Sequence, residues 1–209
     1  MRAQLRIVSG SLRGRKVICN VHPNLRPTPD MVREALFSIL GNAVPGRPFL
    51  DVFAGTGVVG LEALSRGAES ATFVERDFRL AGELGRRLED FGVAGRARVA
   101  RSDVYRWAQR WQAPPEPVTA FLSPPFADLE GRPEAMLGLV RELQAKVAPG
   151  SVLVLQAERA PLLDDLPGRD SWDERRYGRN HLLFWVKEEA GPAEGGGGEH
   201  PGPAGHPPP

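Results

Sequence analysis

The 209-residue sequence has little of what several protein classes require. Its single cysteine, Cys19, excludes a disulfide framework and any metal site built from several cysteines. Its four histidines are scattered, without metal-ligand spacing. No apolar stretch approaches the roughly 20 residues of a membrane-spanning helix, and the N-terminal residues lack the apolar core of a signal peptide. We therefore expect a cytoplasmic protein that binds neither a metal nor a membrane.

The charge is small overall but unevenly distributed along the chain. The net charge of the whole sequence is +1. Residues 1–47 hold eight arginines and lysines against two acids, a net charge of +6, whereas the remainder holds 19 basic and 24 acidic residues, a net charge of −5. Binding to phosphates needs clustered cations rather than a high overall pI. The segment therefore indicates a contact with a polyanion, although a solvated surface would have the same composition.

From residue 49 onward, short apolar runs alternate with longer amphipathic stretches. The apolar runs predict strands at residues 49–54, 70–75, 96–101, 117–123 and 151–158. The stretches between them have helical spacing, at residues 60–67, 79–92, 104–111 and 133–147. Repeated strand–helix units are typical of a parallel sheet covered by helices on both faces. Two further strands, at residues 172–178 and 181–187, follow each other closely and predict an antiparallel terminal hairpin, for seven strands in all.

The N-terminal part has a different pattern. Residues 5–19 predict two short strands around a glycine-containing turn, and residues 26–40 a loop that opens a helix. Thr28 or Asp30 would cap this helix. Its buried stripe would contain Val32, Leu36, Ile39 and Leu40. We thus expect a basic hairpin-and-helix extension at residues 1–46, an α/β domain at 47–188, and a disordered Gly/Pro-rich tail at 189–209.

Residues 51–60, "DVFAGTGVVG", form a G-x-G-x-x-G pattern between a predicted strand and a predicted helix. Glycines at this place allow a tight turn and a close approach to a ligand. A nicotinamide dinucleotide is one candidate. However, Asp51 ends the strand, and its carboxylate would repel a pyrophosphate but would attract an ammonium group. The pattern therefore favours S-adenosylmethionine (SAM), which carries an amino group and a sulfonium beside a ribose and an adenine.

Two more acids follow the next two strands. Glu75 can accept hydrogen bonds from the ribose hydroxyls, and Asp103 can face the adenine amine, with Val104 beside the ring. Ligands of open α/β sheets bind at this carboxyl edge. The alternative is that Asp51 and Asp103 only cap the helices that follow them. The predicted cofactor-binding set is Asp51, Phe53, Ala54, Gly55, Thr56, Gly57, Glu75, Arg76, Asp103 and Val104.

The fourth strand ends in "FLSPPF", residues 121–126. An exocyclic amine of a nucleobase is a weak nucleophile, because its lone pair is delocalised into the ring. Two acceptors that hold its N–H bonds can aim the lone pair at a methyl donor, and the Ser123 hydroxyl and the Pro124 carbonyl can supply them. Phe126 can stack on a flipped base. The catalytic candidates are Ser123, Pro124, Pro125 and Phe126, unless the prolines only end an edge strand.

Together with "SGSLRGRK" (9–16) and "RPTPDMVREALFSIL" (26–40), these motifs resemble the RsmD family of 16S ribosomal RNA guanine-N2 methyltransferases. The resemblance covers residues 6 to about 186. It implies a Rossmann-like class I methyltransferase fold, SAM as cofactor, and methylation of the N2 amine of a guanine in 16S rRNA, in the small ribosomal subunit or an assembly intermediate. We expect a monomer. RNA contacts are expected of Arg13, Arg15, Lys16, Arg26 and Arg33.

Ser123 departs from the pattern of this family, which usually has Asp or Asn at that position. The expected side-chain acceptor is therefore shorter and uncharged. Related amino-methyltransferases that act on DNA cytosine do have serine there. Three alternatives remain: another amino-methyltransferase, acting on DNA or on a protein glutamine; a SAM-binding, RNA-associated protein with weakened catalysis, which Ser123 suggests; and a nicotinamide dehydrogenase, which would bind NAD.

Overall fold

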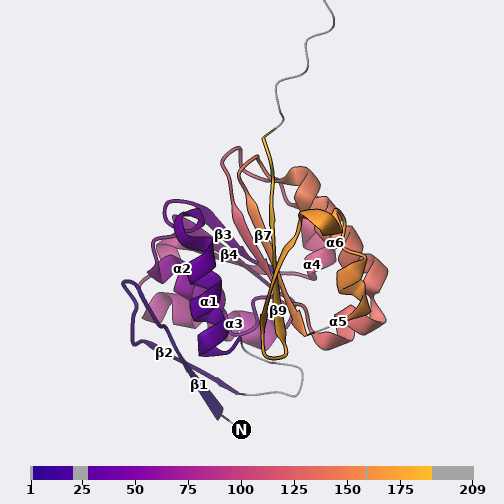
Figure 1. Cartoon of the computed structure of the whole chain (residues 1–209). Helices are drawn as coiled ribbons and strands as arrows, with labels where there is room; N and C mark the ends of the chain where they lie inside the picture. The colour runs from indigo at the N-terminus through magenta and orange to yellow at the C-terminus, as the bar shows by residue number, and fades with distance from the viewer. Residues whose placement is uncertain (1, 21–27, 159, 190–209) are drawn as a thin grey trace, which may run out of the picture.

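The computed structural model describes residues 2–20, 28–158 and 160–189. Figure 1 shows a central sheet between two groups of helices, with α1, α2 and α3 on one side and α4, α5 and α6 on the other. The order of the seven strands is β5-β4-β3-β6-β7-β9-β8. The first five are parallel, whereas β9 runs antiparallel to both β7 and β8. The predicted α/β fold, with its antiparallel terminal hairpin, is confirmed.

Each predicted strand and helix occurs in the structure. The strands of the sheet are β3 (Pro48–Asp51), β4 (Ser70–Glu75), β5 (Ala97–Arg101), β6 (Thr119–Leu122), β7 (Val152–Glu158), β8 (Asp173–Tyr177) and β9 (Asn180–Val186). The helices are α1 (Asp30–Leu40), α2 (Val58–Ser65), α3 (Phe78–Asp90), α4 (Val104–Arg110), α5 (Phe126–Gly131) and α6 (Pro133–Lys146). The short helix α5 was not predicted, because six residues are too few to show a helical period.

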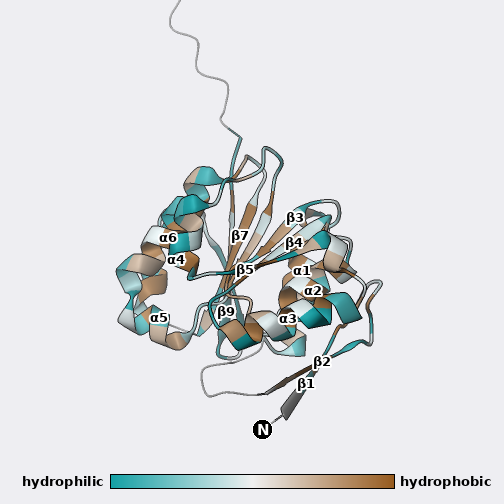
Figure 2. Cartoon of the chain, turned by 180° about the vertical axis from the view of Figure 1, so that it is seen from behind, coloured by the Kyte–Doolittle hydropathy of each residue, from teal (hydrophilic) through white to brown (hydrophobic). Residues whose placement is uncertain are grey.

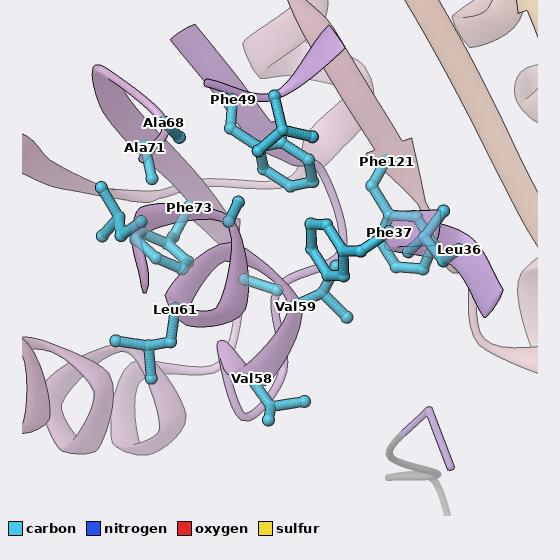
Figure 3. Close-up of a cluster of buried hydrophobic side chains, with 14 of the residues drawn as sticks. Leu36, Phe37, Phe49, Val58, Val59, Leu61, Ala68, Ala71, Phe73 and Phe121 are labelled. Carbon is cyan, nitrogen blue, oxygen red and sulfur yellow. The ribbon is translucent and has the colours of Figure 1, made fainter. Parts of the chain in front are cut away.

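The apolar side chains form two clusters, one on each face of the sheet. Figure 3 shows part of the first cluster, where Phe37 of α1 lies between Phe49 of β3 and Phe121 of β6. The ring centroids of Phe37 and Phe49 are 6.1 Å apart. Burying one such side chain stabilises the fold by about 1.5–3 kcal/mol. Figure 2 shows that hydrophobic residues follow the strands, while hydrophilic residues lie on the outer turns of α3 and α6.

The buried stripe of α1 differs from the predicted one. Ile39 is 41% exposed, and Arg33 and Phe37 are buried in its place. The buried residues still follow the helical period. However, the buried face of α1 includes the positions directly after Val32 and Leu36, and it leaves out Ile39. The predicted side-chain cap is also wrong, because Pro29 precedes the first helical residue, Asp30, and no side chain caps α1.

The N-terminal strands, β1 (Arg2–Arg6) and β2 (Lys16–Asn20), form the expected antiparallel pair. The root of this hairpin is attached to α2. The buried carboxylate of Glu62 accepts hydrogen bonds from the backbone N–H groups of Val8 and Ser9, at 2.8 and 3.0 Å. Gly10 has φ +81°, and a Cβ there would lie 1.8 Å from the carbonyl oxygen of Ser65. Part of "SGSLRGRK" therefore serves to dock the hairpin on the domain.

The extension and the sheet share one core, since Ile7, Leu12 and Val17 belong to the same cluster as Phe49. The end of the predicted tail, residues 190–209, lies outside the described residues, so its disorder stays a prediction. Within the described ranges, no helix has the length and apolar character needed to cross a membrane.

Candidate functional site

A cleft of about 950 Å³ opens at the carboxyl edge of the parallel strands. It brings together residues from β3, β4, β6 and β7, from the start of β9, and from the loops that follow the parallel strands. Among the predicted residues, those that line it are Asp51, Phe53, Ala54, Gly55, Thr56, Glu75, Arg76, Asp103, Val104, Ser123, Pro124, Pro125 and Phe126. Gly57 does not line the cleft. It ends the loop at φ 73° before α2, where a Cβ would lie 2.4 Å from Leu84 Cδ1.

The alternation of side chains along the strands explains why these groups share one face. Phe49 and Phe121 point into the first core cluster. Asp51 and Ser123 each lie two residues further along, so their side chains point to the same side of the sheet. On this face, Phe49 and Phe121 belong to the core, whereas Asp51 and Ser123, nearer the carboxyl edge, line the cleft.

Asp51 lies deep in the cleft, at 2% exposure. Its Oδ2 accepts a hydrogen bond of 3.0 Å from the backbone N–H of Gly60, in the first turn of α2. Burial raises the pKa of Asp51 to about 7; the Gly60 hydrogen bond opposes this rise and the charge of Glu75 adds to it. A cation placed in the cleft would stabilise the ionised carboxylate. This site therefore fits the ammonium group of SAM.

Glu75 is held at the tip of β4 by two backbone groups. Its Oε2 accepts from the N–H of Gly55 at 2.8 Å, and its Oε1 accepts from the N–H of Asp77 at 2.7 Å. Each carboxylate oxygen has a further lone pair that can accept a hydroxyl. Glu75 thus connects the glycine loop to the rim of the cleft and suits a ribose.

Asp103 caps α4 and also lines the cleft. Its Oδ1 accepts from the N–H groups of Tyr105 and Arg106, at 3.1 and 3.3 Å. Its Oδ2 lies 3.6 Å from Arg132 Nη1. The capping role, which the sequence left as an alternative for Asp103, is therefore real, and it fixes the carboxylate beside Val104 at the cleft.

The Ser-Pro-Pro-Phe segment forms the wall of the cleft that follows β6, the strand next to β3. No described residue donates a hydrogen bond to the Ser123 hydroxyl or to the Pro124 carbonyl. The carbonyl of Pro125, by contrast, accepts from the N–H of Asp128 at 2.9 Å and begins α5. Phe126 is 50% exposed. The segment thus offers two acceptors and an accessible aromatic ring.

A second group of residues, which the sequence analysis missed, holds α5 against α4. Tyr105 donates a hydrogen bond of 2.8 Å to the buried carboxylate of Asp128. The guanidinium of Arg132 lies 4.2 Å from the centroid of the Tyr105 ring. Burial, together with the Asp128 carboxylate, raises the pKa of Tyr105 above its usual value. These contacts join residues about 25 positions apart, for which the sequence carries no local signal.

A third group at the cleft was also missed. Thr28 Oγ1 donates a hydrogen bond of 2.7 Å to Gln156 Oε1, and Gln156 Nε2 donates one of 3.0 Å to Asn180 Oδ1. All three residues line the cleft. The sequence did hold one signal of this group: Gln156 is a polar residue within the apolar strand "VLVLQAE".

The predicted RNA-binding residues fall into three groups. Arg13, Arg15 and Lys16 are exposed on the hairpin, outside the cleft, and Arg15 lies 5.4 Å from the centroid of the Phe91 ring. Arg26 lies outside the described residues. The prediction for Arg33 is wrong. Its side chain is fully buried, and its guanidinium donates to the carbonyl oxygens of Thr28 and Arg6 at 2.8 and 2.6 Å.

Comparisons with known proteins place the chain in a family. The family described as "Conserved hypothetical protein 95" matches residues 5–186. The ribosomal RNA small subunit methyltransferase D of Escherichia coli (strain K12) is 42% identical over 123 residues, which span 59% of this chain and 61% of that protein. The YlbH protein of Bacillus subtilis (strain 168) is 35% identical over 187 residues, which span 88% of this chain and 99% of that protein.

Solved structures agree with this placement. The structure of yhhF from Escherichia coli superimposes with a TM-score of 0.73 at 32% identity, over 90% of this chain and 100% of that one. A 16S rRNA N2 methyltransferase of Thermus thermophilus, solved with AdoMet and guanosine, has a TM-score of 0.67 at 24% identity, over 90% of this chain and 50% of that one, and shows the shared fold. The chain belongs to the conserved hypothetical protein 95 family, the RsmD-like class I methyltransferases.

Proposed function

We propose that this protein is a SAM-dependent methyltransferase that modifies the N2 amine of a guanine in 16S ribosomal RNA. The observation that carries the proposal is one cleft that is lined both by a buried acid, Asp51, and by the acceptors of Ser123 and Pro124. The names of the relatives support the substrate class, since the Escherichia coli relative is named a ribosomal RNA small subunit methyltransferase.

The cofactor would lie along the tips of β3, β4 and β5. Asp51 would bind its ammonium group, Glu75 its ribose hydroxyls, and Asp103 with Val104 its adenine. When bound, SAM supplies an electrophilic methyl group on a sulfonium. Asp51 and Glu75 are each held by a backbone N–H of the glycine loop or of α2, so the binding groups are already in place. This preorganisation reduces the entropy that binding costs.

The Ser-Pro-Pro-Phe wall would hold the base. The Ser123 hydroxyl and the Pro124 carbonyl would accept hydrogen bonds from the two N–H groups of the amine. Phe126 would offer its exposed ring for stacking. Positioning of this kind supplies much of the rate of a transfer between two bound groups. A neutral acceptor suffices, because the amine nitrogen becomes acidic only once it carries positive charge. We further propose that the protein acts as a cytoplasmic monomer and that its basic hairpin contacts the RNA.

The test is to incubate the protein with labelled SAM and small ribosomal subunits from cells that lack it. The RNA is then digested, and the methylated nucleosides are identified and mapped by mass spectrometry. We expect N2-methylguanosine at a discrete position. Label in another nucleoside, in DNA or in protein would contradict the substrate assignment.

Ser123 favours one alternative, a SAM-binding RNA-associated protein with weakened catalysis. Calorimetric titration with S-adenosylhomocysteine separates the two functions when it is combined with the transfer assay. Binding of S-adenosylhomocysteine and RNA with little or no turnover would support the alternative, and rapid turnover on small subunits would exclude it.

A further inference from the structure

The cleft continues beyond Ser123 in the direction away from the cofactor acids. The strand order β4-β3-β6-β7-β9 puts Glu75 and Asp51 on one side of Ser123, and Gln156 and Asn180 on the other. A methyl group held between β3 and β6 would therefore meet a base whose remaining edge extends toward β7 and β9.

Gln156 and Asn180 lie on the same face of the sheet as Ser123. Val154 and Leu182 point into the first core cluster, and Gln156 and Asn180 each lie two residues from one of them. The pairing of Leu122 with Leu155 places Gln156 beside Ser123, on a strand about 4.8 Å away. That spacing is comparable to the width of the Watson–Crick edge of a purine.

The hydrogen bonds of Gln156 orient its amide. Its oxygen accepts from Thr28 Oγ1 at 2.7 Å, and one of its N–H bonds points to Asn180 Oδ1 at 3.0 Å. Thr28 and Gln156 are 4% and 6% exposed, so these bonds are shielded from water. A side-chain amide carries two N–H bonds. The N–H groups left for a ligand are the second one of Gln156 and those of Asn180, whereas each amide oxygen already accepts one hydrogen bond.

We propose, on the basis of the guanine-N2 methylation proposed above, that Gln156 and Asn180 select the target base by donating hydrogen bonds to its O6. Guanine has an acceptor at this position, whereas adenine and 2,6-diaminopurine carry an amine. An amine there would direct its own N–H groups at the N–H groups of the two amides, and a buried polar site rejects such a mismatch strongly. Ser123 and Pro124 then hold the reacting amine, and Gln156 with Asn180 decides which purine presents it.

The experiment uses small subunits reconstituted with guanine or 2,6-diaminopurine at the position that the mapping identifies. Both bases have an N2 amine; they differ at C6, which carries the group that Gln156 and Asn180 would contact, and at N1, which carries a hydrogen only in guanine. We expect the wild-type protein to prefer guanine in kcat/KM by roughly 10-fold or more. Gln156→Glu replaces the amide donors with acceptors at equal size, and it should bring this preference close to one or invert it.

One control and one further variant keep the test specific. Gln112→Glu makes the same chemical change at an exposed position and should keep the wild-type preference. Thr28→Val adds no charge but frees the Gln156 amide to rotate, and it should give an intermediate preference. The affinity for S-adenosylhomocysteine should stay within about twofold of wild type in all three variants, because none changes a cofactor-binding residue.

The outcomes separate this inference from the proposed function. Equal rates on both purines for the wild-type protein would overturn the inference, as would equal losses on both purines in Gln156→Glu and Thr28→Val. Absence of N2-methylguanosine on natural small subunits would instead contradict the proposed function, before any purine is exchanged.

Discussion

The carboxylate of Asp51 accepts a 3.0 Å hydrogen bond from the backbone N–H of Gly60. This bond joins the end of β3 to the first turn of α2, across the glycine loop. A single hydrogen bond does not compensate for the loss of water around a buried carboxylate, and burial accordingly raises the pKa of Asp51 to about 7. The charge of this acid therefore depends on what the cleft contains.

The affinity for S-adenosylhomocysteine should increase with pH up to about 7. Below its pKa of about 7, Asp51 is neutral and must lose a proton before it can pair with the ligand's ammonium group. The affinity should therefore rise by up to about 10-fold per pH unit below this value and level off above it. Calorimetric titrations between about pH 5 and pH 9 measure this dependence. Asp51→Asn should bind more weakly and with a flat profile; a flat profile in the wild type would contradict the assignment.

Asp51 should also make the free protein less stable as pH rises. Its folded-state pKa of about 7 exceeds the ordinary aspartate pKa of 3.8, so between these values the folded chain binds more protons than the unfolded chain. The contribution of Asp51 to the free energy of unfolding therefore falls as pH rises from about 4 to about 7. Urea unfolding of the ligand-free protein should show a smaller decrease across this range in Asp51→Asn. If the free energy of unfolding falls equally in the wild type and in Asp51→Asn, groups other than Asp51 cause the decrease.

The sheet and the cofactor side of the cleft could be predicted because their signals are local. The strand at Ser70–Glu75 matches its predicted range, since an apolar run bounded by turn residues defines a strand without reference to the rest of the chain. Asp51 and Glu75 could be placed at one edge because parallel strands all end there.

The rest of the site depends on contacts between distant segments. Thr28 and Gln156 are 128 residues apart, and nothing near either residue indicates the other. The burial of Arg33 could not be predicted either. The helical period predicts which residues of α1 are buried, but it does not show which carbonyl groups pack against them. An arginine in a segment with many other cations is therefore predicted to be exposed.

Ser123→Ala should lower the rate of methyl transfer without changing the affinity for S-adenosylhomocysteine. The alanine removes one of two acceptors for the amine, and the loss of one such hydrogen bond corresponds to roughly 10-fold in rate. Single-turnover transfer to small subunits and calorimetry measure the two quantities separately. Ser123→Asp should give no large gain in turnover if the neutral hydroxyl is sufficient. A large gain would support the function with weakened catalysis.

The exposed cations of the hairpin should contribute to RNA binding through phosphate contacts. Replacing Arg13, Arg15 and Lys16 with glutamine should weaken RNA binding. It should also reduce the slope of log affinity against log salt by up to about 2–3, because fewer phosphate contacts release fewer counterions. Fluorescence anisotropy with a ribosomal RNA fragment at several salt concentrations measures this slope. The control is Arg110→Gln with Arg141→Gln, which removes two exposed cations from helices on the other face. If the hairpin variant keeps the wild-type slope, its cations are only solvated.

Arg33→Met should destabilise the fold and leave the salt dependence of RNA binding unchanged. The guanidinium of Arg33 is fully buried and donates hydrogen bonds to the carbonyl oxygens of Thr28 and Arg6. These bonds connect α1 to the cleft and to the hairpin. Removing it leaves these carbonyls without their donor, at a cost of about 3 kcal/mol in the free energy of unfolding. Urea denaturation measures the cost, with the exposed Arg141→Met as control. A stable variant with a reduced salt slope would instead show that Arg33 leaves its buried site to contact RNA, since only a solvent-accessible cation can release counterions from a phosphate.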